Sequence, residues 1–94
     1  MAAFNLSFQK DRKFTHAQAD AITITSEDGA QDGVAILLKV AGDSTNTLSF
    51  ASDFESLDGV TFDSTKMNHI YMIYDVDGNG TVPKVFYTIK QTAL

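Results

Sequence analysis

The sequence predicts an all-β protein, a single small antiparallel β-sandwich of about seven strands that ends in a long hairpin. The first observation is that apolar and polar residues alternate in short stretches, which recur roughly every 8–15 residues as in sandwiches and barrels. The second is that helical spacing of apolar residues is hard to find. The third is the length of 94 residues, which suits one hydrophobic core, so residues 1–94 are expected to form one domain.

Alternation is clear in two segments of the first part of the chain. Phe4, Leu6 and Phe8 alternate with polar residues, which predicts a strand with one aromatic-rich buried face. In residues 22–25, isoleucines alternate with threonines, and the Glu-Asp-Gly that follows is typical of a turn. Between these strands, residues 15–21 are the one place where we expect a short helix or an irregular connection.

The middle of the chain contains the most apolar segment. Residues 34–41 are largely apolar on both alternating faces, so we expect a central strand, with Lys39 marking the end where its second face reaches solvent. Residues 48–50 follow a polar turn as a further strand. The acidic segment 53–59 is expected to be a surface loop, and residues 60–62 a short strand.

The strongest hairpin signal lies near the end of the chain. Residues 68–76 and 82–90 are two long runs of aromatic and β-branched residues, and the intervening residues 77–81 read Asp-Gly-Asn-Gly-Thr. Asp, Asn and Gly are selected by tight hairpin turns because they accept positive φ at low cost. The only proline, Pro83, stands near the start of the last strand, where its missing N–H is tolerated.

Composition excludes several classes of function. Twelve acidic and seven basic residues give a net charge of −5, which is the wrong sign for a surface that neutralises phosphates, so no nucleic-acid partner is expected. Cysteine is absent, which excludes disulfides, thiolate metal sites and cysteine nucleophiles. The longest apolar runs are far too short to cross a bilayer, and the first residues carry no secretory signal pattern, so no membrane association is expected.

The hairpin turn also suggests a calcium site. Residues 75–82 fit the first eight positions of an EF-hand loop, with Asp75, Asp77 and Asn79 as oxygen ligands and Gly80 at the sixth position. The twelfth position, however, falls on Phe86 instead of a glutamate, and strands flank the loop where helices are required. We therefore predict a plain turn and no metal cofactor, with weak calcium binding as the alternative.

No catalytic residues are predicted. Asp53 and Glu55 would lie roughly 6.6 Å apart on an extended chain, a spacing that suits a glycosidase pair. Catalysis needs one of the two carboxyl groups desolvated, and an acidic surface loop does not provide that environment. A basic cluster, Lys10, Arg12 and Lys13, is interpreted as a solvated turn, with docking of an acidic partner as the alternative.

Aromatic residues crowd the last hairpin. Tyr71, Tyr74, Phe86 and Tyr87 occupy both faces of its two strands, so Tyr71 and Phe86 or their neighbours are expected outside if the other face fills the core. A small domain rarely exposes such a strip without covering it. These four residues are therefore predicted to form a partner-binding surface, and a homo-oligomer is expected.

From residue 29 onward the chain resembles a domain that recurs in tailed-phage virion proteins. The family pattern is a β-rich G-x-a-x-L-x-V run, a G-x-x-T-L-x-F turn and strand, a short aromatic loop, and an I-x-x-I-Y-D-G strand that leads to an aromatic x-x-Y-x-I. Residues 33–40, 42–50, 54–62 and 70–87 fill these slots. Residues 4–25 are similar to the opening strand of the same module, whereas the turn in residues 74–81 is longer than the usual Y-D-G-T.

The resemblance implies a non-enzymatic virion structural protein on the exterior of the particle, made in the host cytoplasm. A chain without a collar, coiled coil or receptor-binding extension suits capsid decoration or a head-fibre or tail-associated accessory role, with the major capsid protein or other virion proteins as partners. Two alternatives remain at this point. One is a carbohydrate-binding module that uses Tyr71, Tyr74 or Phe86 as sugar platforms, supported by calcium, and the other is a hydrolase that uses Asp53 and Glu55.

Overall fold

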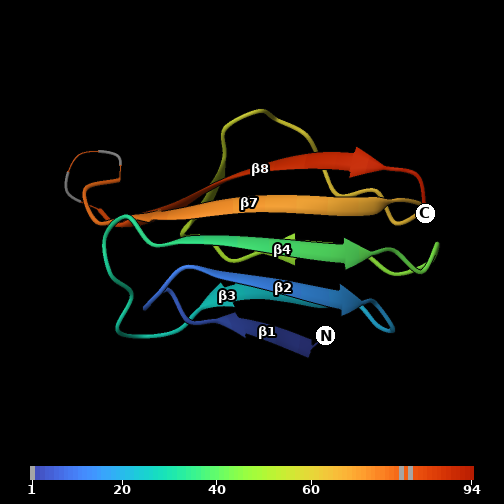
Figure 1. Cartoon of the computed structure of the whole chain (residues 1–94), viewed down its shortest axis with the longest axis horizontal. Helices are drawn as coiled ribbons and strands as arrows, with labels where there is room; N and C mark the ends of the chain where they lie inside the picture. Colours follow the sequence, from blue (N-terminus) through green and yellow to red (C-terminus); the bar gives the residue numbers. More distant parts are fainter. Residues whose placement is uncertain (1, 79, 81) are drawn as a thin grey trace.

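A computed structural model describes residues 2–78, 80 and 82–94, and these residues contain eight strands and no helix. The all-β prediction is therefore confirmed for the described chain. Two sheets pack against each other as in a sandwich (Figure 1). The strands are β1 (Ala2–Leu6), β2 (Arg12–Ala17), β3 (Ile22–Ser26), β4 (Ala35–Ala41), β5 (Leu48–Phe50), β6 (Phe54–Ser56), β7 (Met67–Asp75) and β8 (Lys84–Thr92).

The first six strands alternate between the two sheets, which makes most of the pairing parallel. The smaller sheet has the order β1-β3-β5, and both of its pairs are parallel. The larger sheet has the order β2-β4-β7-β8-β6, in which only β7 runs antiparallel to its neighbours. The prediction of an antiparallel sandwich of about seven strands was therefore wrong in pairing. Each of the strands β1 to β5 pairs with one two places away in sequence, and the strand between them, in the other sheet, brings the chain back so that the two neighbours run in the same direction.

Three local predictions also differ from the structure. Residues 12–17 form β2, where a solvated turn and a helix or irregular connection were expected. Residues 54–56 form β6 instead of a surface loop, because the Phe54 side chain is buried and the segment pairs with β8. Residues 60–62 are not a strand, and the N–H of Val60 is bound by the carboxylate of Asp58 (3.1 Å).

The core lies between the sheets and contains the alternating residues of the sequence. The smaller sheet contributes β-strand residues Leu6, Ile22, Ile24 and Leu48. The larger sheet contributes Ile36, Leu38, Val40, Phe54, Ile70, Met72, Val85 and Ile89. Phe8, just after β1, is fully buried among them. The strand predicted from residues 34–41 is confirmed as β4, which has a neighbour on each side in its sheet.

The predicted hairpin is confirmed. β7 and β8 pair antiparallel over their whole length, from Met67 opposite Thr92 to Asp75 opposite Lys84. Gly78 in the turn has a φ of +47°, and a Cβ there would lie 2.0 Å from the carbonyl oxygen of Val82, so the position requires glycine. Asn79 and Thr81, which belong to the predicted turn, lie outside the described residues.

A buried asparagine connects the hairpin to the preceding turn. Asn68 is fully buried on β7, and its Oδ1 accepts hydrogen bonds from the N–H of Asp63 (3.0 Å) and Nε2 of Gln91 (3.0 Å). Its Nδ2 donates to the carbonyl oxygens of Asp63 (2.8 Å) and Lys66 (3.0 Å). The side chain therefore takes the place of main-chain partners in a turn that has no strand beside it.

We predict that Asn68→Ala lowers the free energy of unfolding by about 2–4 kcal/mol, because several buried polar groups lose their partners at once. Urea denaturation at neutral pH measures the change. Thr92→Ala, on the exposed end of the neighbouring strand, is the control and should change stability by less than about 0.5 kcal/mol. Equal effects of the two substitutions would contradict the role given to Asn68.

Candidate functional site

The candidate site is an apolar area on the outer face of the larger sheet. Leu37, Tyr71, Ile73 and Phe86 alternate with buried residues on β4, β7 and β8, so their side chains point away from the core. Leu37 lies opposite Tyr71, and Ile73 lies opposite Phe86. Tyr71 is 49% exposed and Ile73 is 43% exposed. We call these four residues the outer patch.

Among the residues that the structure describes, the outer face of the smaller sheet has no such patch. On the smaller sheet, the positions that alternate with buried residues include Asn5, Thr23, Thr25 and Ser49, all polar and uncharged. Thr23 Oγ1 and Ser49 Oγ are hydrogen-bonded across neighbouring strands (3.1 Å), and the Thr25 hydroxyl donates to Oδ1 of Asn5. The two outer faces of the sandwich therefore differ in kind, and only the larger sheet offers an apolar contact area.

The four aromatic residues predicted as a binding surface do not share one face. Tyr71 and Phe86 belong to the outer patch, whereas Tyr74 and Tyr87 face inward and pack against the core. The ring of Tyr87 stacks on Phe50 with centroids 4.0 Å apart, and the ring of Tyr74 lies 6.2 Å from that of Phe8. The sequence analysis did not include Leu37 and Ile73, although the period-two alternation would have placed them beside Tyr71.

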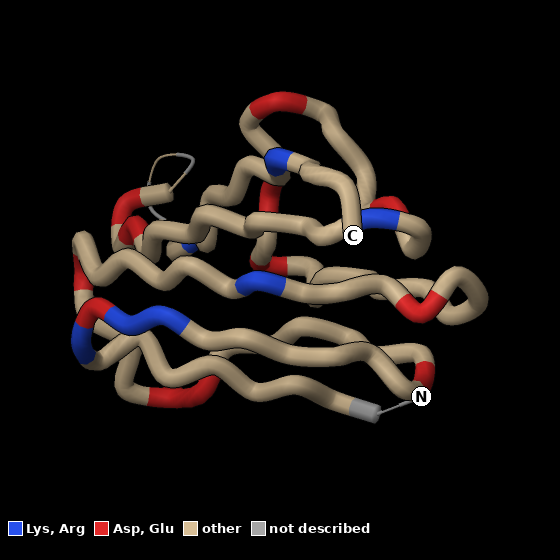
Figure 2. The backbone as a smooth tube through the Cα atoms, turned by 45° about the vertical axis from the view of Figure 1, so that its right-hand side comes forward, with Lys and Arg blue, Asp and Glu red and all other residues tan. Residues whose placement is uncertain are grey.

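Lysines surround the outer patch although the chain carries a net charge of −5. Four lysines lie on the same face of the larger sheet, either directly opposite a patch residue or one cross-strand pair further along that face. They are Lys13, Lys39, Lys84 and Lys90. The carboxylates on the strands of this face are Glu55 and Asp75. Most other acidic residues lie in connections and at strand ends (Figure 2). Positive charge is therefore concentrated around the apolar area.

Of the ligands in the calcium alternative, Asp75 stabilises the turn with its carboxylate. Oδ1 of Asp75 accepts hydrogen bonds from the N–H groups of Asp77 (3.0 Å) and Gly78 (3.1 Å), which is the pattern of an Asx turn. Asn79 lies outside the described residues. Within the part of the chain that the structure describes, no three acidic or histidine side chains are gathered in a way that would hold a metal ion.

The carboxylates of the possible glycosidase pair point to different sides of β6. Oδ2 of Asp53, just before the strand, accepts a hydrogen bond from Oγ of Ser26 on the smaller sheet (2.9 Å). Glu55 lies opposite Phe86, a residue of the outer face. This arrangement does not place the two carboxyl groups on either side of one cleft, so it gives no support to the hydrolase alternative.

Comparison with known protein families, curated proteins and solved structures finds no match to this chain. In the described residues there is no helix long and apolar enough to cross a membrane.

The carboxylates of Asp43, Asp58 and Asp63 accept hydrogen bonds in three turns, and these bonds make the stability depend on pH. Hydrogen bonds from the N–H and side chain of Asn46 lower the pKa of Asp43 below 3.8, and those from Val60 and Thr65 do the same for Asp58 and Asp63, respectively. A lowered pKa in the folded state means that the stabilisation is complete above the unfolded-state pKa. It is lost as the pH falls through the folded-state pKa.

We therefore expect the free energy of unfolding to fall as the pH is lowered from about 5 to below 3.8. Asp58→Asn should lower stability at pH 7 and make this loss smaller, because the carboxylate that binds the N–H of Val60 is gone. Denaturant titrations at a series of pH values measure both effects. Asp28→Asn, at an exposed position in the turn after β3, is the control, and a pH dependence that is the same in both variants would refute the assignment to Asp58.

Proposed function

We propose that this chain is a non-enzymatic structural protein that attaches to a larger assembly through the outer patch. The observation that carries the proposal is the half-exposed pair Tyr71 and Ile73 in the middle of an otherwise regular sheet face. The resemblance of the sequence to a virion domain suggests which assembly this is. On that basis we propose a decoration or accessory protein on the exterior of a tailed phage, with the major capsid protein or another virion protein as the partner.

Several features of the outer patch favour a protein partner. Aliphatic side chains, Leu37 and Ile73, lie beside the aromatic ones, as in the centre of protein interfaces. The outer patch lies on the outer face of a sheet, and none of its four residues lines the pocket between the sheets, whereas small molecules are bound in concave sites. The surrounding lysines provide a charged rim, which is the usual arrangement around an apolar interface centre.

The carbohydrate-binding alternative depends on the exposed ring of Tyr71, since aromatic rings serve as platforms for sugars. One of the three rings suggested for it, Tyr74, packs against the core, so only Tyr71 and Phe86 share one surface. The calcium that would support it lacks an assembled ligand set in the described residues. We therefore place protein attachment first.

The outer patch predicts self-association of the purified chain, which light-scattering mass at two concentrations measures. Tyr71→Lys should weaken this association by about tenfold or more, because it puts a charge in the centre of the apolar contact. The fold should survive, since the side chain is 49% exposed. Leu94→Lys adds the same charge at another exposed apolar position and should leave the mass distribution unchanged. A monomer at every concentration, or the same mass for both variants, would contradict self-association through this patch.

Attachment to a virion is tested on particles. Antibodies raised against the purified chain should label the exterior of tailed particles in immunogold electron microscopy. The particles used are those of the phage whose genome encodes the chain. Particles assembled with Tyr71→Lys should lose most of the label, and those with Leu94→Lys should keep it. Unlabelled particles would overturn the virion proposal, and specific binding to a glycan array that Tyr71→Lys abolishes would favour the carbohydrate-binding module instead.

A further inference from the structure

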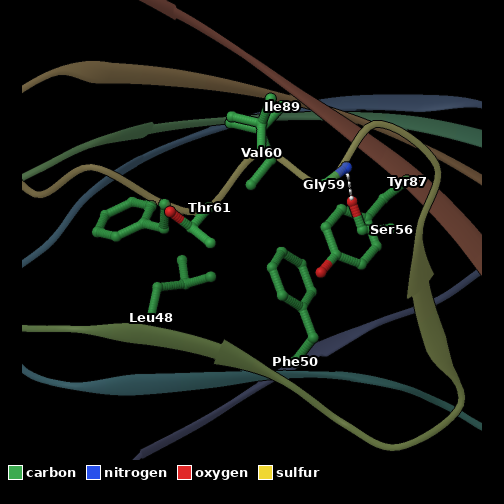
Figure 3. Close-up of a pocket in the computed structure, with 9 residues that line it drawn as sticks. Leu48, Phe50, Ser56, Gly59, Val60, Thr61, Tyr87 and Ile89 are labelled. Carbon is green, nitrogen blue, oxygen red and sulfur yellow. Dashed lines mark hydrogen bonds between the residues drawn. The ribbon is translucent and has the colours of Figure 1, made fainter.

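A pocket opens between the two sheets at the side where β5, β6 and β8 meet, away from the outer patch (Figure 3). Its volume is about 170 Å³. Leu48 and Phe50 point into it from β5, and Val60 and Ile89 lie across from them (Figure 3). The full lining is Leu48, Phe50, Ser56, Gly59, Val60, Thr61, Phe62, Tyr87 and Ile89.

The walls of the pocket are largely apolar, and two polar groups at its rim have hydrogen-bond partners within the chain. Oγ of Ser56 accepts a hydrogen bond from the N–H of Gly59 (2.9 Å) and donates to Oδ1 of Asp58 (3.2 Å). The carbonyl oxygen of Thr61 accepts one from Nε2 of Gln91 (2.8 Å). No Lys, Arg, Asp, Glu or His lines the pocket. A charged ligand would lose its hydration there without gaining a counter-charge.

The only ionisable group in the lining stays neutral. Burial, together with the nearby carboxylate of Asp58, raises the pKa of the Tyr87 hydroxyl above its usual 10.0. The Tyr87 ring lies nearly parallel to that of Phe50, with an interplanar angle of 19°. One wall of the pocket is therefore a stacked aromatic pair, which packs well against another flat ring.

The shape of the pocket is built into the fold. The segment that closes it, residues 57–62, is attached to β8 through Asp58, whose Oδ2 accepts from the N–H of Ile89 (3.3 Å) and lies 3.9 Å from Nζ of Lys90. The N–H of Leu57 donates to the carbonyl oxygen of Tyr87 (2.9 Å). These bonds hold the segment away from Leu48 and Phe50, so a ligand would find the pocket formed and would not have to open it.

We propose that this pocket binds one apolar ring or branched alkyl group of about six heavy atoms, the size at which dry apolar cavities of about 150 Å³ take up benzene. The group has two possible sources, a free small molecule or a side chain of a partner protein. The proposal does not depend on the proposed function, because the pocket lies between the sheets and the outer patch on the far side of one of them. Failure of one proposal therefore leaves the other unaffected.

Methyl NMR spectroscopy tests the proposal, because the lining residues Leu48, Val60 and Ile89 carry methyl groups that can be labelled. Toluene, as a free ring, should shift the methyl signals of Leu48, Val60 and Ile89 in a saturable manner. The methyl signals of Ile24 and Leu38, which belong to the core but not to the lining, should move much less. The absence of a saturable shift in the lining up to the solubility limit of every probe used would overturn the proposal.

A second series separates the two sources. N-acetylphenylalanine amide and N-acetylleucine amide present the same groups as protein side chains. If the capped residues bind, the pocket accepts a side chain of a partner protein. If toluene binds and the capped residues do not, the pocket is a site for a free small molecule.

Val60→Phe fills the pocket from the connecting segment and should weaken binding of toluene by about tenfold or more. Val76→Phe is the matched control, since Val76 is 45% exposed and lies outside the lining, and it should leave binding unchanged. Binding that Val60→Phe does not weaken, or shifts spread evenly over core and lining, would contradict the pocket as the site. The methyl shifts of the unaltered chain provide the test even if Val60→Phe fails to fold.

Discussion

The structure depends on apolar packing between two layers, because the first six strands pass from one sheet to the other at every step. No strand in this part of the chain pairs with the strand before it, so local hairpin formation does not hold it together. Contact between the buried faces of the sheets, with Leu6 and Ile24 on one side and Leu38 and Ile70 on the other, supplies the stabilisation. Because all of these pairings join distant parts of the chain, the fold has a high contact order, and we expect it to form slowly for its size.

The β7–β8 hairpin interrupts this alternation and produces both surfaces of interest. It lies between β4 and β6, which would otherwise be neighbours, and it widens one sheet to five strands. On β8, Phe86 points outward to the outer patch, while Tyr87 and Ile89 point inward and line the pocket. The smaller sheet has three strands, so β5 ends it beside the pocket. The pocket follows from this unequal width, since only the connecting segment 57–62 covers the core there.

Polar side chains complete the ends of the sandwich where strands are lacking. Asn68 supplies hydrogen bonds to the turn before β7, and Asp58 attaches the connecting segment to β8. Charges protect the exposed edge of the larger sheet, since Arg12 and Lys13 lie on the edge strand β2, and the opposite edge strand, β6, has only three residues. The outer patch itself lies on a sheet face and away from the sheet edges, where a partner of defined shape can cover it.

The sequence by itself determined the strand content, most of the core and the final hairpin. Period-two alternation shows which side chains share a face, and the Asp-Gly-Asn-Gly turn requires residues that accept positive φ, so both features are local. Tertiary structure alone decided the parallel pairing, the strand at Phe54–Ser56 and the separation of Tyr71 and Phe86 from Tyr74 and Tyr87. Alternation does not specify which strands pair or which of two apolar faces turns inward. Those choices depend on how distant segments pack, and in this chain nearly every pairing is distant.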